Sequence, residues 1–280
     1  MKHWKLLLPG FMLLLGLPAA QAAITCTSVA SSAALIYYVN NTLDSVQVTL
    51  TVSCNRGNNR DPLSLAYTVA ADNGNNALGQ NNRAALGAAR LDYDTYKTSG
   101  CNTIWGSNPQ ANRIRDTITW TAGQTGTRTM QTSAWVCITA TQTATTAGSY
   151  LDTVNLTLRY GSSQVVGSMP VTIVAPSVCT ITTVPGNIAL TYTAFAATTA
   201  ASTPFAVRCT SGMPYTLATD VADGVLAGVR YLLGLSATTA NGTGNPQAYT
   251  ITATIPGGQA GTCAGSGCSG TRAHTLTVSY

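Results

Sequence analysis

The residues of this chain best suited to chemistry are its eight cysteines. They are Cys26, Cys54, Cys101, Cys137, Cys179, Cys209, Cys263 and Cys268. No C-x-x-C pair occurs, and His274 is the only histidine beyond the first 22 residues, so the ligands of a zinc site are missing. An even number of cysteines in an exported chain indicates disulfide bonds formed in an oxidising compartment. We therefore expect no metal site and no redox chemistry.

Catalytic groups are scarce. The sequence contains no glutamate, and any Ser/His/Asp or Cys/His arrangement would have to be built around His274. Asp92 and Asp94 have the i, i+2 spacing that puts two carboxylates on one strand face, but Arg90 two positions earlier favours a solvated charge ladder. The glycines at 257–258 and 265–270 lack the lysine of a phosphate loop. We expect neither an enzyme nor a cofactor.

The tryptophans offer a surface for binding. Trp105 is flanked by glycine, asparagine and serine, a composition that predicts a loop tip, and Ile104 precedes it. Trp120 and Trp135 lie in the same region, and exposed aromatic rings on a rigid scaffold would hold an apolar surface. The alternative for each ring is burial in the core, and it is strongest for Trp135, which stands in a strand-like run beside Cys137. We take Ile104, Trp105, Trp120 and Trp135 as adhesive candidates.

The first 22 residues are typical of a secretory signal peptide. Lys2 and Lys5 precede an apolar stretch over residues 6–17, and Ala20-Gln21-Ala22 forms an A-x-A cleavage site. Without the two leader lysines, 12 Lys and Arg stand against nine Asp, a net charge of about +3. Such a weak excess, with no basic cluster, excludes an electrostatic footprint for nucleic acid.

The remaining chain predicts an all-β protein. Val46, Val48, Leu50, Val52 and Cys54 alternate with polar residues, as a half-buried strand requires. The stretches 154–160 and 276–280 alternate in the same way, and clusters of Gly, Asn, Asp and Pro separate the runs. The length allows two domains, each with a core of its own.

The two halves repeat each other. Cys26 and Cys54 lie 28 positions apart, Cys179 and Cys209 lie 30 apart, and each half ends in an alternating strand. Eight cysteines allow 105 connectivities. The repeat favours pairs Cys26 with Cys54 and Cys179 with Cys209, leaving Cys101 with Cys137 and Cys263 with Cys268. Two copies of a sandwich-sized module are the simplest account.

Certain motifs in both halves resemble a known family. The first half ends G-S-Y-L-D-T-V at residues 148–154, and the second half contains C-T-S-G-M-P-Y at 209–215. These runs resemble the spore coat protein U domain, the module of archaic, Csu-type chaperone-usher pili. The chain departs from the family where a phenylalanine-glycine pair is usual: it has Tyr37-Tyr38 and Tyr192-Thr193 there.

The resemblance implies two immunoglobulin-like sandwiches, each lacking one strand that a donor strand must supply. Val165, Gly167, Met169, Val171 and Ile173 line one face just before the second copy, where a donor strand would stand, with Ser168, Pro170 and Thr172 on the other face. We interpret residues of about 164–174 as a donor that fills the first domain within the same chain. An ordinary final strand followed by a linker is the alternative. The resulting domains are 23–176, adhesive and self-complemented, and 177–280, an incomplete pilin domain.

The family resemblance also implies partners. Only Ala23, Ile24 and Thr25 precede Cys26 after the leader, whereas relatives donate the segment before that cysteine. We therefore expect a chain that accepts a strand and donates none, which places it at a pilus tip on the cell surface. Its expected partners are a periplasmic chaperone, an outer-membrane usher, a neighbouring pilin subunit and an apolar surface or receptor used in biofilm formation. A non-adhesive minor pilus or coat subunit is the first alternative, and a secreted carbohydrate-binding module is the second.

Overall fold

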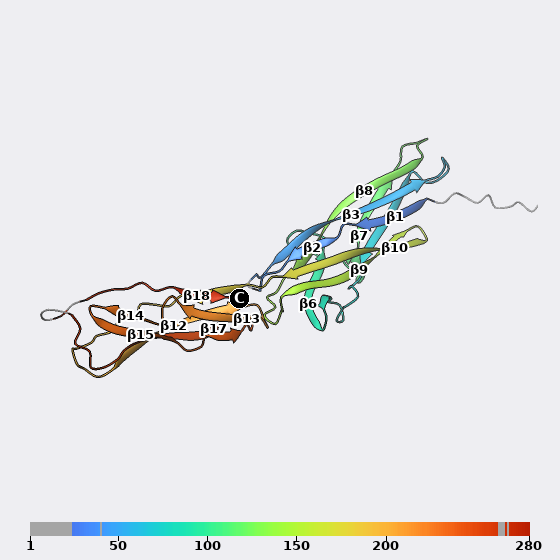
Figure 1. The fold of residues 1–280 in the computed structure, drawn as a ribbon. Helices are drawn as coiled ribbons and strands as arrows, with labels where there is room; N and C mark the ends of the chain where they lie inside the picture. Colours follow the sequence, from blue (N-terminus) through green and yellow to red (C-terminus); the bar gives the residue numbers. More distant parts are fainter. Residues whose placement is uncertain (1–23, 40, 263–266, 268) are drawn as a thin grey trace, which may run out of the picture.

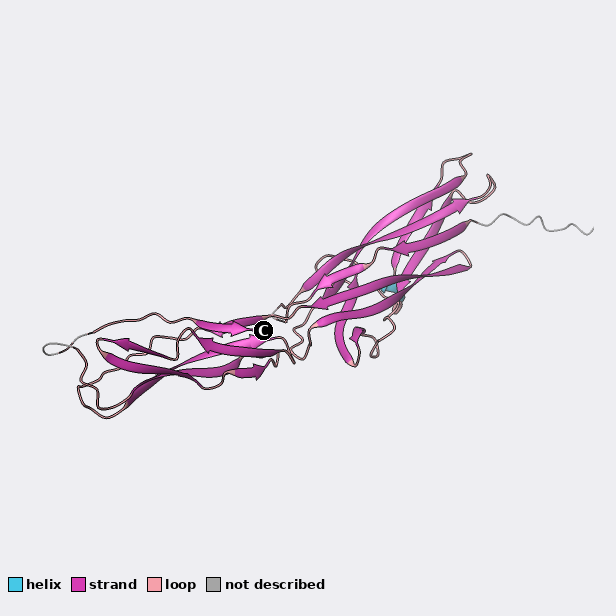
Figure 2. Ribbon diagram, in the orientation of Figure 1, coloured by secondary structure: helices cyan, strands magenta, loops and turns pink. Residues whose placement is uncertain are grey.

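The computed structural model describes residues 24–39, 41–262, 267 and 269–280. These residues form two β-rich domains that lie end to end (Figure 1). Strands make up nearly all the regular structure (Figure 2), and the single helical turn among the described residues is η1 (Gln110–Asn112). Within the described part of the chain, no helix is long and apolar enough to cross a membrane. The predicted signal peptide, residues 1–22, lies outside the described residues.

The first domain is an immunoglobulin-like sandwich of two layers. Its strands are β1 (Thr25–Ala30), β2 (Ala33–Ile36), β3 (Asp44–Arg56), β4 (Ser64–Ala71), β5 (Asn82–Leu86), β6 (Ala89–Tyr96), β7 (Ile114–Thr119), β8 (Gly126–Ile138), β9 (Gly148–Tyr160) and β10 (Ser163–Ala175). One layer has the order β1-β3-β8-β6-β5, and the other has β7-β4-β9-β10-β2. β5 joins the layers, because Ala85 also pairs with Leu151 of β9.

The second domain has the same strand order with two strands fewer. Its strands are β11 (Cys179–Thr183), β12 (Thr199–Cys209), β13 (Pro214–Thr219), β14 (Asp223–Leu226), β15 (Val229–Leu235), β16 (Thr239–Asn241), β17 (Gln247–Ile255) and β18 (Leu276–Ser279). The layer β11-β12-β17-β15-β14 repeats β1-β3-β8-β6-β5, and β16-β13-β18 repeats β7-β4-β9. Among the described residues of this domain, nothing corresponds to β2 and β10.

The alternation read from the sequence decides which side chains enter the first core. On β3, Val48, Leu50, Val52 and Cys54 are buried while Thr49, Thr51 and Ser53 are half-buried on the other face. β9 repeats the pattern with Val154, Leu156 and Leu158. Successive strand residues point to opposite faces, so one apolar face per strand suffices to build a core between two layers.

Three of the four expected disulfide bonds are present. They join Cys26 to Cys54, Cys101 to Cys137 and Cys179 to Cys209. The first and third link the opening strand of each domain to its neighbour, because Cys26 is the register partner of Cys54 and Cys179 that of Cys209. The expected bond between Cys263 and Cys268 lies outside the described residues.

Candidate functional site

β10 closes the core of the first domain along its whole length. It pairs antiparallel with β9 and parallel with β2. Met169, Val171 and Ile173 are completely or almost completely buried, while Ser168 and Pro170 on the other face are exposed and Thr172 is half-buried. The predicted alternation is therefore present, and the remaining candidates, Val165 and Gly167, are half-buried on the same strand.

Gly167 marks a place where β10 passes very close to β1. A Cβ on this glycine would stand 2.8 Å from the backbone carbonyl oxygen of Ser28. Only a glycine avoids that contact without a shift of the backbone. β10 thus lies between β1 and β2 on one side and β9 on the other, which is the position of a closing strand.

The second domain has no such closing strand among its described residues. β18 occupies the place of β9, yet it pairs only with β13. The open edge of β18 is therefore an unpaired row of backbone groups, which invites a strand from elsewhere.

The second core is correspondingly incomplete. Leu276 and Val278 of β18 contact the core but stay partly exposed, whereas Leu156 and Leu158 of β9 are fully buried. Other side chains that contact this core and remain only partly buried are Ile188, Leu235, Ala240 and Tyr249. We call this partly exposed apolar surface of the second core the groove; a strand like β10 would cover it, since β10 covers the equivalent surface in the first domain.

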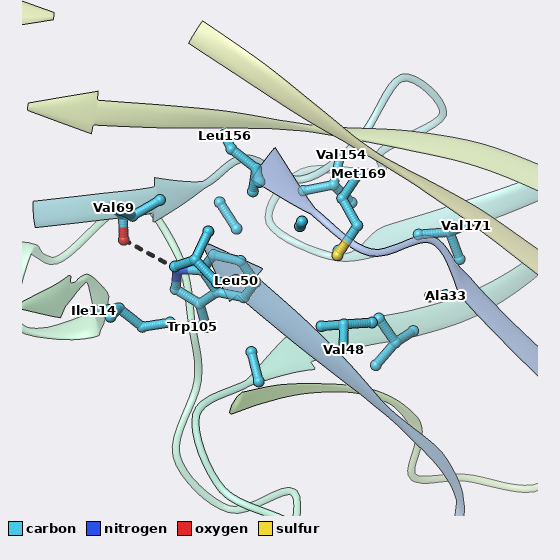
Figure 3. Close-up of a cluster of buried hydrophobic side chains, with 14 of the residues drawn as sticks. Ala33, Val48, Leu50, Val69, Trp105, Ile114, Val154, Leu156, Met169 and Val171 are labelled. Carbon is cyan, nitrogen blue, oxygen red and sulfur yellow. Dashed lines mark hydrogen bonds between the residues drawn. The ribbon is translucent and has the colours of Figure 1, made fainter. Parts of the chain in front are cut away.

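Trp105 does not lie at an exposed loop tip, so our expectation for it is wrong. It is 1% exposed and lies in the same buried cluster as Leu50, Val69 and Met169 (Figure 3). Its indole Nε1 donates a hydrogen bond to the carbonyl oxygen of Val69 at 3.0 Å. The turn-forming neighbours do bend the chain, but they bend it inward, because Thr95 holds the Trp105 backbone through two hydrogen bonds.

The other adhesive candidates also differ from expectation. Trp120 is 4% exposed, and its Nε1 donates to the carbonyl oxygen of Gly126. Trp135, the ring most expected to be buried, is half-buried on β8 beside Gln47 and Tyr96 of the neighbouring strands. Ile104 is 39% exposed. The structure therefore does not bring the four candidates together into one exposed aromatic surface.

The run at 148–154 positions two loops. Asp152 is buried and accepts hydrogen bonds from the Tyr93 hydroxyl, the Asn75 amide and the Asn76 side chain. Burial, together with the hydrogen bond to Asp152, raises the pKa of Tyr93 well above its ordinary value, so its hydroxyl remains a donor. These bonds fasten the β4–β5 loop to β9.

Tyr150 of the same run organises the junction between the domains. Its hydroxyl hydrogen-bonds with the backbone of Thr146 in the β8–β9 loop. Thr146 forms a parallel bridge with Ser211 of the second domain. Gly244 approaches the same loop so closely that a Cβ would overlap the carbonyl oxygen of Thr143.

His274 is part of a hydrogen-bonded chain in the second domain. Its Nε2 lies 2.8 Å from the Tyr231 hydroxyl, and its Nδ1 lies 2.9 Å from an Asp220 carboxylate oxygen. In an arrangement like Ser/His/Asp, the Tyr231 hydroxyl would be the nucleophile. Tyr231 is only 9% exposed, so this hydroxyl is enclosed. Sequence reasoning missed this grouping, because the three residues are far apart in the chain. Within the described residues, no group of three or more His, Cys, Asp or Glu could hold a metal ion.

Comparison with solved structures finds similar chains at low sequence identity. One chain of the CsuC–CsuE chaperone–tip adhesion subunit pre-assembly complex of Acinetobacter baumannii Csu pili aligns at 12% identity, covering 91% of this chain and 100% of that chain, with a TM-score of 0.49. The CupB6 tip adhesin of Pseudomonas aeruginosa aligns at 10% identity over 91% and 94% of the two chains, with a TM-score of 0.36. The CooA pilin subunit of enterotoxigenic Escherichia coli aligns at 15% identity over 55% and 98%, with a TM-score of 0.31.

A comparison with curated proteins found no match. The sequence does match the Spore Coat Protein U domain family over residues 15–157, just over half of the chain. The match ends within β9 of the first domain, so a second copy of the family domain in residues 177–280 stays a prediction. On the strength of the first half, the chain belongs to the Spore Coat Protein U domain family.

Proposed function

We propose that this chain is the tip adhesin subunit of a chaperone-usher type pilus, attaching cells to surfaces in biofilm formation. Its first domain is complete and carries the attachment surface. Its second domain accepts a strand from the neighbouring pilin subunit. No catalytic role is part of the proposal.

One observation carries the proposal: the second domain repeats the strand order of the first, but its described residues include no strand that closes it. β10 buries Met169, Val171 and Ile173 in the first core, whereas Leu276 and Val278 of the second core, with no such strand among the described residues, stay partly exposed. An open sheet edge beside exposed apolar side chains is unstable in isolation and is completed by strand addition.

The open groove also supports the proposed partners. A periplasmic chaperone would protect the groove before assembly, and an usher would exchange that protection for the strand of the next subunit. The chaperone named in the Acinetobacter complex is a partner of that adhesin. For this chain, the argument is that a groove with partly exposed Ile188, Leu235 and Tyr249 needs cover during export.

The attachment surface needs a new location, because the buried Trp105 and Trp120 do not reach a ligand. The outer face of the β2–β10–β9 sheet offers one. Ile36 and Val174 are register partners with 54% and 37% exposure, and Leu151, 56% exposed, pairs with Thr172 of the same sheet. β2 and β10 carry no charged residue. We call Ile36, Leu151 and Val174 the outer strip and assign apolar adhesion to it.

The strand-acceptor proposal is tested with the β10 segment as a peptide. A peptide of the sequence Ser163–Ala175 should bind the full chain and stabilise the second domain, because binding only the folded state raises stability in proportion to the logarithm of its concentration. A control peptide with Asp at the positions of Val171 and Ile173 should not bind. A second domain that unfolds cooperatively at the same temperature with and without either peptide would contradict the proposal.

The adhesive part is tested separately. Aspartate at Ile36 and Leu151 should strongly reduce retention of the protein on polystyrene, with little change in stability, because both side chains are exposed. Leu78→Asp is the matched control, since Leu78 is 64% exposed but lies outside the outer strip. Equal losses in both variants would remove the strip from the proposal.

The burial of Trp105 and Trp120 favours a second candidate, a non-adhesive minor pilus or coat subunit. That reading requires tryptophans in the core, and only Trp135 is half-buried. It predicts strand acceptance without retention on surfaces, so the two experiments above separate the candidates. A carbohydrate-binding module is disfavoured, because the tryptophans on which that alternative relies are buried at Trp105 and Trp120, and because such a module needs no partner strand.

A further inference from the structure

Phe195 presents two unfavourable features at once. Its side chain is 72% exposed, and its backbone has a left-handed φ of +59°. Left-handed backbone is costly for residues other than glycine, asparagine and aspartate, and a large exposed aromatic side chain gains nothing from burial. Hydrogen bonds hold the backbone in this conformation, but the ring itself stays exposed among the described residues. Strain that a fold maintains at an exposed position indicates a functional contact.

A dense hydrogen-bond network holds Phe195 in this position. The Phe195 amide donates to the Gln259 carbonyl oxygen at 2.8 Å, and the Ala196 amide donates to the carbonyl of Thr193. The Tyr192 hydroxyl accepts a hydrogen bond from the Gln259 amide. The Gln259 side chain in turn bonds to both backbone groups of Arg230. Two loops and the start of β15 are thereby fastened together, so the ring is presented on a rigid base.

The network lies at the end of the second domain that faces away from the first. The register of β12 shows this, because Cys209 at one end is close to the domain junction: Thr210 bonds to the carbonyl of Pro176. Thr199, at the other end of β12, pairs with Ile255. Phe195 precedes Thr199 and Gln259 follows Ile255, so both lie at the far end (Figure 1).

In the first domain, the end equivalent to the Phe195 end is a docking surface for the next domain. Because the strands correspond, the β8–β9 loop of the first domain is the counterpart of the β17–β18 loop that contains Gln259. The β8–β9 loop docks on the next domain of the chain through Thr146 and Thr143, which contact Ser211 and Gly244. The corresponding end of the second domain has no partner within the described chain.

We propose that Phe195 is an anchor at which the second domain docks against the body of the pilin subunit whose strand fills its groove. This inference rests on the proposed function. The open edge of β18 starts at this end with Leu276, since Leu276 pairs with Thr219, the end of β13 remote from the junction. The first domain occupies the other end of the groove, so the body of the incoming subunit must lie at the Phe195 end. A rigid aromatic side chain is a typical anchor for such a contact.

The test measures binding of two probes to the full mature chain. One probe is pilin recovered by dissociating the pili of the producing cells, and the other is the Ser163–Ala175 peptide. Phe195→Ala should weaken pilin binding about tenfold, as expected for removal of an interface anchor, and leave peptide binding unchanged. Phe195→Gly should weaken pilin binding to the same extent and should also raise the thermal stability of the chain, because glycine tolerates the left-handed backbone. Val184→Ala, a 78% exposed side chain earlier in the same connection, is the control and should bind normally.

The outcomes separate the inference from the proposed function. If Phe195→Ala and the unaltered chain bind pilin equally while both bind the peptide, the anchor is wrong and strand acceptance stands. If the unaltered chain binds neither probe, the proposed function itself fails.

Discussion

The hydroxyl of Tyr150 donates a hydrogen bond to the backbone carbonyl oxygen of Thr146 at 2.9 Å and accepts one from the Thr146 amide at 3.1 Å. Tyr150 is fully buried in the first core, while Thr146 touches the second domain. The packing of one domain therefore fixes the surface on which the other rests.

Gly244→Val should open the domain junction. The new Cβ would overlap the Thr143 carbonyl oxygen, and the left-handed φ of +75° adds conformational strain of about 1–2 kcal/mol. Gly258→Val is the control, because Gly258 has a similar φ of +79° but no atom within 4 Å of its Cβ position. Small-angle X-ray scattering should show a larger radius of gyration for Gly244→Val alone. Identical profiles for both variants would mean that the junction does not depend on this contact.

Val171→Asp should destabilise the first domain by more than about 4 kcal/mol, because it places an unpaired carboxylate in a closed core. Ser168→Asp, on the exposed face of β10, should change the stability by less than about 0.5 kcal/mol. Tryptophan fluorescence during urea unfolding reports the first domain alone, since Trp105, Trp120 and Trp135 all lie in it. Equal midpoints for the two variants would contradict the assignment of β10 as the closing strand.

Trp105→Ala should cost about 3–5 kcal/mol, as for other fully buried large-to-small changes, with an added loss from the unpaired Val69 carbonyl. Trp135→Ala should cost less, because its ring is only half-buried. Ile104→Ala, next to Trp105 and 39% exposed, serves as the control for a local change in the loop. Circular dichroism melting gives the comparison, and a larger loss for Trp135→Ala than for Trp105→Ala would be inconsistent with this core.

The second domain should lose stability in acid through Asp220. Burial would raise the pKa of this carboxyl, but hydrogen bonds from His274, Thr275 and Val221 outweigh it and hold the pKa below the ordinary value. A group with a lowered pKa stabilises the fold above the unfolded value of about 3.9 and stops doing so as the pH falls through the folded value.

Asp220→Asn should therefore remove part of the acid dependence of the second domain, measured as the calorimetric transition that tryptophan fluorescence does not report. Asp223→Asn, which breaks an exposed ion pair with Arg230, is the control and should change the stability little. An unchanged acid profile in Asp220→Asn would argue against the bond to His274.

The sequence predicted the strands well because their signal is local. The alternation from Val48 to Cys54 and from Met169 to Ile173 depends only on neighbours two positions apart, and the structure buries these faces. The disulfide bond between Cys26 and Cys54 could also be predicted from the sequence, because Cys179 and Cys209 have nearly the same spacing in the second half.

Trp105 could not be predicted in this way. Its neighbours correctly indicate a turn, but whether a ring at a turn faces water or core depends on distant residues. Here the connection between β6 and β7, 17 residues long against three between β15 and β16, brings the ring to the Val69 carbonyl. The Tyr231–His274–Asp220 chain is similarly long-range, and nothing in the local sequence of His274 indicates it.

The turn at Gly161 and Ser162, which joins β9 to β10, has a consequence for valency. Because two residues tether β10 to β9, β10 is present at the first core at an effective concentration of about millimolar or more. A free strand from another molecule does not reach that concentration, so it does not displace β10. The first domain is thus closed to exchange with other chains. Under the proposed function, the described residues leave one strand-accepting edge, that of β18 in the second domain, and an assembly would grow from that edge.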